Sequence, residues 1–457
     1  KGIETGEKYY SMGHTRYRSV ATFANATYSY DGRYTLNGTF RYEGTNRMGR
    51  SRSARWLPTW NLSAAWNVHE EKFFQSLQPT LSNLTFKASY SLTADRGPAD
   101  VTNSQAIIKS YSPYRPFTDI QETGLHIVDL ENSELTYEKK HELNIGVDVG
   151  FINNRINLSA DWYTRNNYDL IGLIPTQGVG GTIYKYANVA TMKSHGIEFT
   201  LSTSNIKTKD FSWNSDFIFS HAKNEVTDLR GRTRMMELVS GNGFAREGYP
   251  VRGLFSIPFA GLDEKGIPMF DINGNITSTD INFQEREKLD YLKYEGPTDP
   301  TITGSFGNVF AYKGFKLNVF MTYSFGNVVR LNPYFNYKYS DLSAMPREFK
   351  NRWTLSGDEA KTNIPAILSN PQYEANRTLY KAYNYSTERI AKGDFIRMKE
   401  ISLSYEFPKS WISAAKISNL SLKLQATNLF LIYADKKLNG QDPEFFNTGG
   451  VASPVPR

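Results

Sequence analysis

The chain has 457 residues, a formal net charge of +7 and no cysteine. Without cysteine there can be no disulfide framework, thiolate metal centre or cysteine nucleophile. Aromatic residues make up 14% of the chain, which excludes an intrinsically disordered protein. The basic residues form no long tract, so we expect no nucleic-acid partner. No run of about 18 apolar residues is present, which excludes a transmembrane helix but not the short strands of a β-barrel.

Apolar and polar residues alternate strictly along many segments. In one of them, Leu143 and Ile145 lie on one face, while Asn144 and Asp148 lie on the other. A period of two predicts strands rather than helices. We expect roughly fourteen such strands, most of them about ten residues long, which is the length of a tilted membrane strand. In chain order, the clearest alternating segments are residues 60–66, 84–90, 143–149, 156–163, 197–201, 315–323 and 400–407.

The connections between these segments alternate between short and long. The short ones carry turn residues and lie at Asp31-Gly32, Asn153-Asn154, 207–210 and Lys313-Gly314. The long ones run over about 43–57, 92–138, 222–298 and 326–392. In an up-and-down barrel, alternate connections lie on the same side of the membrane. The predicted fold is therefore an all-β, transmembrane, antiparallel up-and-down β-barrel with long extracellular loops.

The sequence contains no pattern typical of catalysis, metal binding or cofactor binding. None of the six histidines has the spacing of a zinc site, and the Ser-nucleophile elbow and the phosphate loop are both absent. The segment DINGNITSTD begins like a calcium loop, but Ile276 replaces the required glycine and Asn282 replaces the required glutamate. Asn-Gly turn chemistry explains this segment better. We therefore predict no catalytic residue, metal site or cofactor, and no enzyme activity.

Aromatic and arginine side chains in the long loops are the candidate ligand-binding residues. Flat rings stack on sugars or grip peptide side chains, and arginine supplies hydrogen bonds. Two alternatives remain: these residues pack their own loops, or Phe335, Tyr337 and Tyr339 share one face of an extended strand. The candidates are Tyr111, Tyr114 and Arg115 in one loop, and Arg330, Tyr334 and Tyr337 in another.

Several longer segments together carry a resemblance to a known family. They occur in family order and at family-like spacing, and they cover nearly the whole chain. The segments are WLPTWNLSAAWNVHEEKFF, LSNLTFKASYSLTAD, LTYEKKHELNIGVDVGFINNRINLSADWYTRNNYDLI, YKYANVATMKSHGIEFTL, REGYPVRGLFSIPFAGLDEKGIPMF, DPTITGSFGNVFAYKGFKLNVFMTYSFGN, GDFIRMKEISLSYEFP, LKLQATNLFLI and QDPE. With them the chain resembles the C-terminal barrel portion of SusC-like TonB-dependent outer-membrane transporters of Bacteroidota.

The resemblance implies a place in a larger protein. Residues 1–457 would form the C-terminal part of a barrel of about 22 strands. The N-terminal plug and the final strand would lie outside this chain. The expected location is the bacterial outer membrane, with lipid around the barrel.

The resemblance also implies an activity and partners. It implies active import of a glycan or an oligopeptide, driven by the TonB complex through the plug. A SusD-like surface lipoprotein would act as a lid, and pairs of transporter and lid would form dimers.

Two other functions remain open from the sequence. The first is a passive porin or a secretion-associated barrel, because strand patterns alone do not exclude a pore without ligand gating. The second is a secreted β-structured binding protein or enzyme, in which the outward faces pack sheet on sheet. The plug distinguishes the first from an importer, and solubility without detergent distinguishes the second.

Overall fold

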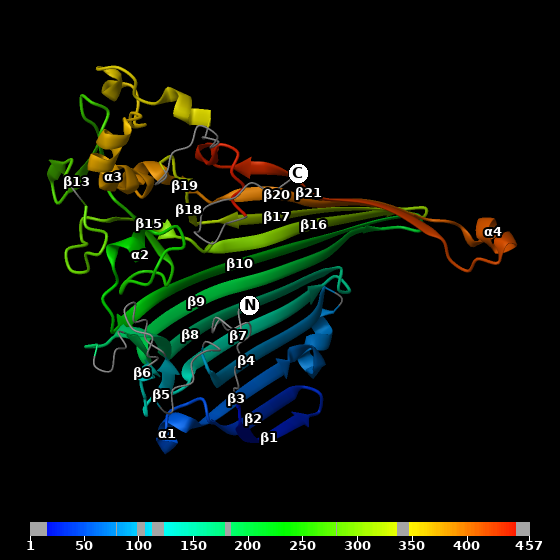
Figure 1. Ribbon diagram of the computed structural model, residues 1–457. Helices are drawn as coiled ribbons and strands as arrows, with labels where there is room; N and C mark the ends of the chain where they lie inside the picture. The colour runs from blue at the N-terminus through cyan, green and yellow to red at the C-terminus, as the bar shows by residue number, and fades with distance from the viewer. Residues whose placement is uncertain are drawn as a thin grey trace, which may run out of the picture.

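A computed structural model describes residues 16–78, 80–97, 106–111, 123–178, 184–279, 281–335 and 347–444. Its main feature is one 12-stranded sheet in which every neighbouring pair is antiparallel and the strands follow chain order (Figure 1). This confirms the all-β, up-and-down prediction. The strands are β1 (Ser19–Tyr30), β2 (Tyr34–Thr45), β3 (Trp56–Asn67), β4 (Leu81–Asp95), β7 (Glu138–Phe151), β8 (Ile156–Pro175), β9 (Tyr184–Lys207), β10 (Phe211–Leu229), β16 (Ile302–Tyr312), β17 (Phe315–Phe325), β20 (Phe395–Glu406) and β21 (Ser421–Ala434).

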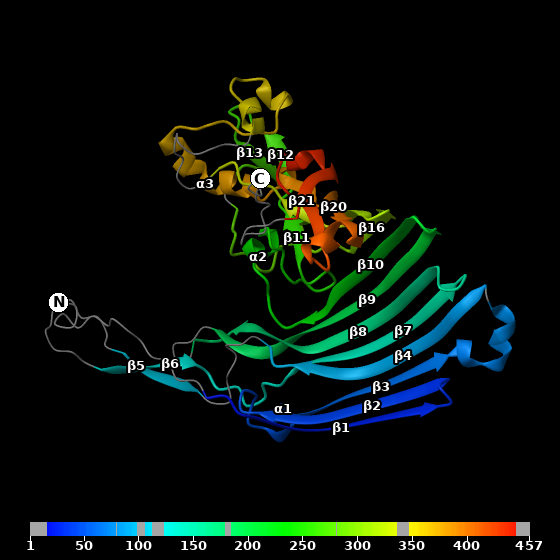
Figure 2. The ribbon, with the colours of Figure 1, turned by 90° about the vertical axis from the view of Figure 1, so that its right-hand side faces the viewer.

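The sheet curves into a wall (Figure 2). Among the described residues, β1 and β21 each pair on one side only. The roughly fourteen strands expected from the sequence therefore become twelve wall strands, together with shorter strands in the long connections.

The strand register gives the wall two chemically different faces. One row of paired residues runs through Phe86, Val147, Ala160 and Phe199, and it defines the apolar face. The next row runs through Lys87, Gly146, Asp161 and Glu198, and it defines the polar face. Large side chains of the apolar face remain open to their surroundings. Phe86 is 45% exposed and Trp162 is 43% exposed.

Short connections gather at one end of the wall, the turn end. Asp31-Gly32 and Lys313-Gly314 both adopt positive φ angles, which a two-residue hairpin with the right twist requires. The two longer connections at this end contain short helices. These are the 3₁₀ helices η1 (Val68–Glu70) and η2 (Lys72–Leu77), then α4 (Lys409–Ile412) and the 3₁₀ helix η7 (Ser413–Ala415).

The opposite end, the loop end, carries the long connections. The first two hold α1 (Arg52–Arg55) and the hairpin of β5 (Ile107–Tyr111) and β6 (Gly124–Asp129). The described residues of 230–301 and 326–394 fold together, and we call them the loop domain. Its elements are α2 (Met235–Val239), β11 (Gly253–Ser256), β12 (Phe259–Leu262), β13 (Pro268–Ile272), β14 (Asn275–Thr277), β15 (Lys293–Pro297), β18 (Val328–Arg330), η4 (Arg347–Asn351), η5 (Asp358–Ala360), α3 (Asn370–Asn384), η6 (Thr387–Arg389) and β19 (Ile390–Lys392), and η8 (Lys436–Leu438) lies beside β19.

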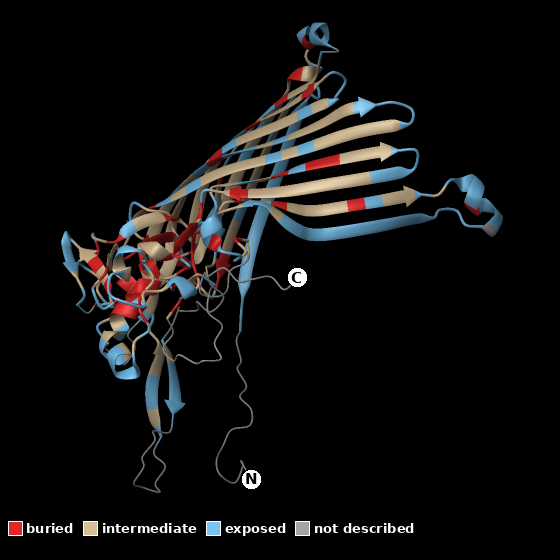
Figure 3. Ribbon diagram, turned by 90° about the horizontal axis from the view of Figure 1, so that it is seen from above, coloured by how far each residue is buried: buried red, intermediate tan, exposed pale blue. Residues whose placement is uncertain are grey.

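Most of the fully buried side chains belong to the loop domain (Figure 3). Its core takes Phe255 and Phe270 from the first connection, and Tyr334, Phe349 and Tyr383 from the second. The two connections thus share one hydrophobic core. The Asn273-Gly274 turn between β13 and β14 has positive φ angles at both residues, as expected from Asn-Gly turn chemistry.

Helix α3 has no counterpart in the sequence-based expectations. Its helical start is marked by a capping box between Ser369 and Gln372 and by Pro371 in the first turn. Across the described residues, no helix is both long and apolar enough to cross a bilayer.

Candidate ligand-binding site at the loop end of the wall

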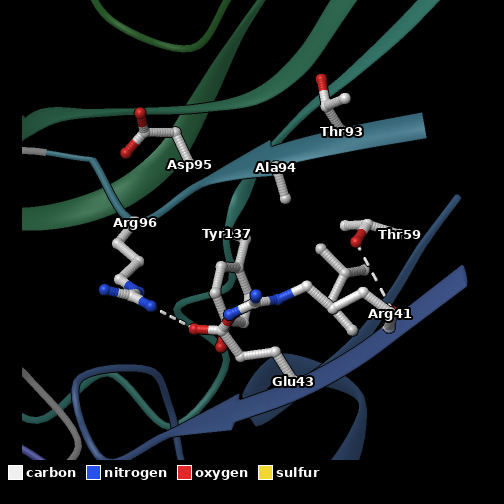
Figure 4. Close-up of a pocket in the computed structure, with 9 residues that line it drawn as sticks. Arg41, Glu43, Thr59, Thr93, Ala94, Asp95, Arg96 and Tyr137 are labelled. Carbon is white, nitrogen blue, oxygen red and sulfur yellow. Dashed lines mark hydrogen bonds and ion pairs between the residues drawn. The ribbon is translucent and has the colours of Figure 1, made fainter. Parts of the chain in front are cut away.

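A cavity of about 340 Å³ lies at the loop end, on the polar face of β2, β3 and β4 (Figure 4). Neighbouring strands supply its walls because alternate residues of each strand point to the same face. Tyr137, just before β7, closes one side. The lining residues are Arg41, Glu43, Leu57, Thr59, Thr93, Ala94, Asp95, Arg96 and Tyr137.

Two arginines share one carboxylate in this cavity. Arg41 Nε donates to Glu43 Oε2 at 2.9 Å, and Arg96 forms a second ion pair with the other carboxylate oxygen of Glu43 (Figure 4). The Glu43 side chain is 13% exposed, whereas that of Arg41 is 47% exposed. Arg41 therefore presents part of its guanidinium to the cavity. If Arg41 turned to a ligand, Arg96 would still neutralise the charge of the Glu43 carboxylate.

Tyr137 adds a neutral hydroxyl to the same cavity. Burial, with a smaller contribution from the nearby Glu43 carboxylate, raises the pKa of Tyr137 to about 12. The hydroxyl donates to the Arg55 carbonyl at 3.3 Å. Cations, carboxylates and hydroxyls therefore line the cavity, without a nucleophile and base in contact. Such an arrangement suits recognition of a polar ligand.

Charged pairs continue along the polar face of the wall. Lys87 Nζ lies 2.7 Å from Asp148 Oδ2, and Ser159 donates to the same carboxylate at 2.6 Å. Farther toward the loop end, Glu142 pairs with Lys140 at 2.7 Å and with Arg165 at 3.2 Å. A face covered by ion pairs and hydroxyls stays hydrated, as the lumen wall of a membrane barrel does.

Arg330, a predicted ligand contact, is buried inside the loop domain. Its side chain donates to the carbonyls of Ser386 and Phe255 at 3.0 and 2.7 Å, and to Ser256 Oγ at 3.2 Å. Burial lowers the pKa of the Arg330 guanidinium to about 9, which still leaves the group charged at neutral pH. Arg330 therefore joins the two long connections in this conformation, with its guanidinium buried between them.

Tyr334, another predicted contact, is also buried, with 3% of its surface exposed. Its ring stacks on Tyr383 with 6.2 Å between centroids, and the Arg389 guanidinium lies 3.6 Å from its centroid. Burial raises the pKa of Tyr334 well above its ordinary value. Both Arg330 and Tyr334 are thus packed inside the loop domain, Tyr334 against its own connection and Arg330 also against the other one.

Of the other predicted ligand contacts, one is exposed and three lie outside the residues that the structure describes. Tyr111 ends β5 and is 47% exposed, with an edge-to-face contact to His126 at 5.0 Å. Tyr114, Arg115 and Tyr337 lie outside the described residues. Tyr111 is thus the predicted residue that the structure leaves open to a ligand.

A second charged cluster had no counterpart in the predicted site. Arg397 of β20 pairs with Asp442 and Glu444, and Lys399 pairs with Glu444 at 2.7 Å. The segment Gln441–Glu444 is thereby held against the polar face of β20. In the sequence, QDPE stood out through the family resemblance, and no local pattern pointed to its basic partners.

The described part of the chain contains no group of three or more histidine or acidic residues placed to hold a metal ion.

Comparison with known proteins decides the family. The family described as "TonB dependent receptor-like, beta-barrel" matches residues 3–429. The chain belongs to this family. It is a family of outer-membrane transport receptors and not of enzymes, so the predicted location in the outer membrane and the SusC-like resemblance are confirmed.

Curated relatives of this TonB-dependent receptor family align over almost the whole chain. TonB-dependent receptor P3 of Formosa agariphila is 25% identical over 455 residues, which cover 93% of this chain and 42% of the relative. TonB-dependent receptor SusC of Bacteroides thetaiotaomicron is 26% identical over 470 residues, covering 97% of this chain and 43% of SusC. The chain therefore spans less than half the length of these relatives.

A solved structure shares the fold. The RagAB peptide importer in its closed-closed state superposes with a TM-score of 0.75 at 24% identity, covering 95% of this chain and 46% of that chain. The match supports the arrangement of the wall strands and long connections. The alternative of a secreted β-structured binding protein or enzyme does not fit this family.

Proposed function

We propose that this chain is the C-terminal wall of an active importer in the outer membrane. The observation that carries the proposal is the division of the wall into an apolar and a polar face, with a folded loop domain at one end. The apolar face suits lipid, and the polar face suits a hydrated passage. Energy would come from the TonB complex acting through a plug encoded outside residues 1–457.

The long connections would face outside the cell and receive a SusD-like lipoprotein lid. The relationship to SusC supports this partner. The shared core of the loop domain supports it as well, because a folded surface can dock a lid more firmly than separate flexible loops. We also propose that pairs of transporter and lid form dimers.

The substrate would be a glycan or an oligopeptide that passes the cavity around Arg41. The cavity offers charges and hydroxyls for hydrogen bonds, and Tyr111 offers an open ring for stacking. Arg41→Gln in the full-length protein is expected to weaken substrate binding roughly tenfold, which is the value of one hydrogen bond to a charged group. Assembly should persist because Arg96 still pairs with Glu43.

Uptake of labelled oligopeptides and oligosaccharides by whole cells tests this proposal. Arg232→Gln is the matched control, because the Arg232 side chain is 70% exposed on the loop domain. We expect uptake that requires TonB, is lowered by Arg41→Gln and is unchanged by the control. Equal uptake in cells that lack TonB would instead support the passive pore.

A further inference from the structure

The apolar face carries a band of histidine and lysine near the loop end. Three of the chain's six histidines lie there, each two residues from a lysine on the same strand. Residues two apart on a strand share a face. The pairs are Lys139 and His141 on β7, Lys193 and His195 on β9, and His221 and Lys223 on β10.

The three pairs have the same order relative to the membrane. Strands β7 and β9 run from the loop end to the turn end, and β10 runs back. On each strand the lysine is therefore nearer the loop end, and the histidine is nearer the apolar belt. Next to the histidines, toward the turn end, the same face carries Leu143, Ile197 and Phe219.

The histidines lie along a slanted line across the sheet. His141 is in register with Asn166, which is in register with Lys193, so His195 lies two residues nearer the turn end. His195 is in register with Lys223, so His221 lies two residues nearer still. With strands about 4.8 Å apart and about 3.4 Å per residue, this line is inclined by about 43° to the register rows.

That slope matches the tilt of strands in a membrane barrel, about 35–45°. The hairpin turns are displaced in the same direction: from β1 to β7, the ends of the strands shift toward the turn end relative to the register rows. Tyr30 at the end of β1 is in register with Val147, four residues before β7 ends at Phe151. In a wall tilted by this angle, the line of histidines runs parallel to the membrane plane, at the loop-end edge of the apolar face.

Two lysines of the band have no ion-pair partner among the residues that the structure describes. Lys139 pairs with Asp169 at 2.6 Å, and His221 Nδ1 lies 3.0 Å from the Thr301 carbonyl. By contrast, Lys193 and Lys223 are exposed and form no ion pair within the described residues, although Glu225 is in register with Lys193. His195 is exposed too, directly across from Lys223.

We propose that Lys193, His195 and Lys223 bind the phosphate of an anionic lipid headgroup in the outer membrane. His195 and Lys223 are opposed on adjacent strands, where side chains are about 5 Å apart, and Lys193 lies two residues from His195 on β9. Lipid chains would cover the apolar belt beside them, so the phosphate would sit at the level of these cations. The proposal does not depend on what the protein transports.

Native mass spectrometry of the full-length protein in detergent tests this directly. The probes are lipid A and its dephosphorylated form, which differ only in phosphate. We expect lipid A to be retained, and Lys193→Gln with Lys223→Gln to weaken its retention at least about tenfold, since each basic residue near headgroups adds attraction. The same lysines changed to arginine should keep lipid A bound.

The control variant carries Lys316→Gln and Lys423→Gln, which remove equal charge from the polar face. It should retain lipid A as the unchanged protein does. Equal retention of the two lipids by the unchanged protein would overturn the proposal, and that comparison needs no variant. Unaltered lipid A retention by the glutamine variant would overturn it as well.

Discussion

Replacing Arg330 with alanine is expected to unfold the loop domain while the barrel wall stays assembled. Arg330 is 2% exposed, and its guanidinium links Phe255 and Ser256 of one long connection to Ser386 of the other. Alanine would leave a cavity and two buried carbonyls without this donor. Loss of these charge-assisted hydrogen bonds should cost roughly 3 to 5 kcal/mol of loop-domain stability.

Arg330→Lys should give an intermediate result. One ammonium group on a flexible stem cannot reproduce the fork that reaches both carbonyls. Hydrogen exchange measures the effect, as lost protection of α3 and β11 with unchanged protection of the wall strands. Arg232→Ala is the matched control, since that side chain is 70% exposed. Unchanged protection of α3 in Arg330→Ala would show that Arg330 does not join the connections.

The second large effect is expected at neighbouring residues of β17 that lie on opposite faces. Val319 is in register with Ile401 on the apolar face, and Asn318 is in register with Ser402 on the polar face. An arginine at the bilayer midplane on a lipid-facing surface costs about 2 to 4 kcal/mol. Val319→Arg should therefore lower the fraction of assembled protein in the outer membrane.

Asn318→Arg is the matched control for the same residue change. The new guanidinium would enter the hydrated side, where Asn318 already donates to Glu400 at 3.3 Å. Assembly should remain normal, and transport should change. Gel electrophoresis with and without heating measures assembly for both variants, because a folded barrel migrates faster than the same protein unfolded by heat. The fraction that migrates fast without heating is the assembled fraction. If both were tolerated equally, the assignment of the two faces would be wrong.

The wall could be predicted from the sequence because each of its strands and turns is determined by residues that are close together in the chain. Alternation over residues 143–149 predicts both the strand and its two faces, and Asn153-Asn154 predicts the turn that follows. The loop domain depends on contacts that are distant in sequence. Arg330 stands 75 residues from Phe255 along the chain, and no local pattern shows that they meet.

The same limit explains the predicted site. Aromatic residues in long loops fit both ligand contact and internal packing, and only the tertiary structure shows that Tyr334 is buried. Arg96 and Glu43 lie 53 residues apart, so the cavity at the loop end had no signal in the sequence. Helix α3 was missed because its core-facing side chains gain partners from distant parts of the chain, such as Phe259 and Tyr334, which both contact Tyr383.

The orientation of the wall in the outer membrane is the central claim, and cysteine labelling tests it most directly. Because residues 1–457 contain no cysteine, Ile276→Cys in β14 and Lys209→Cys in the turn between β9 and β10 each add a thiol that is absent from this part of the protein, and the unchanged protein is the labelling control. Ile276 is 65% exposed, and Lys209 is exposed too. We expect a large PEG-maleimide added to intact cells to label Ile276→Cys at once, and Lys209→Cys only after the outer membrane is opened. Labelling of Lys209→Cys in intact cells, with Ile276→Cys protected, would contradict the account.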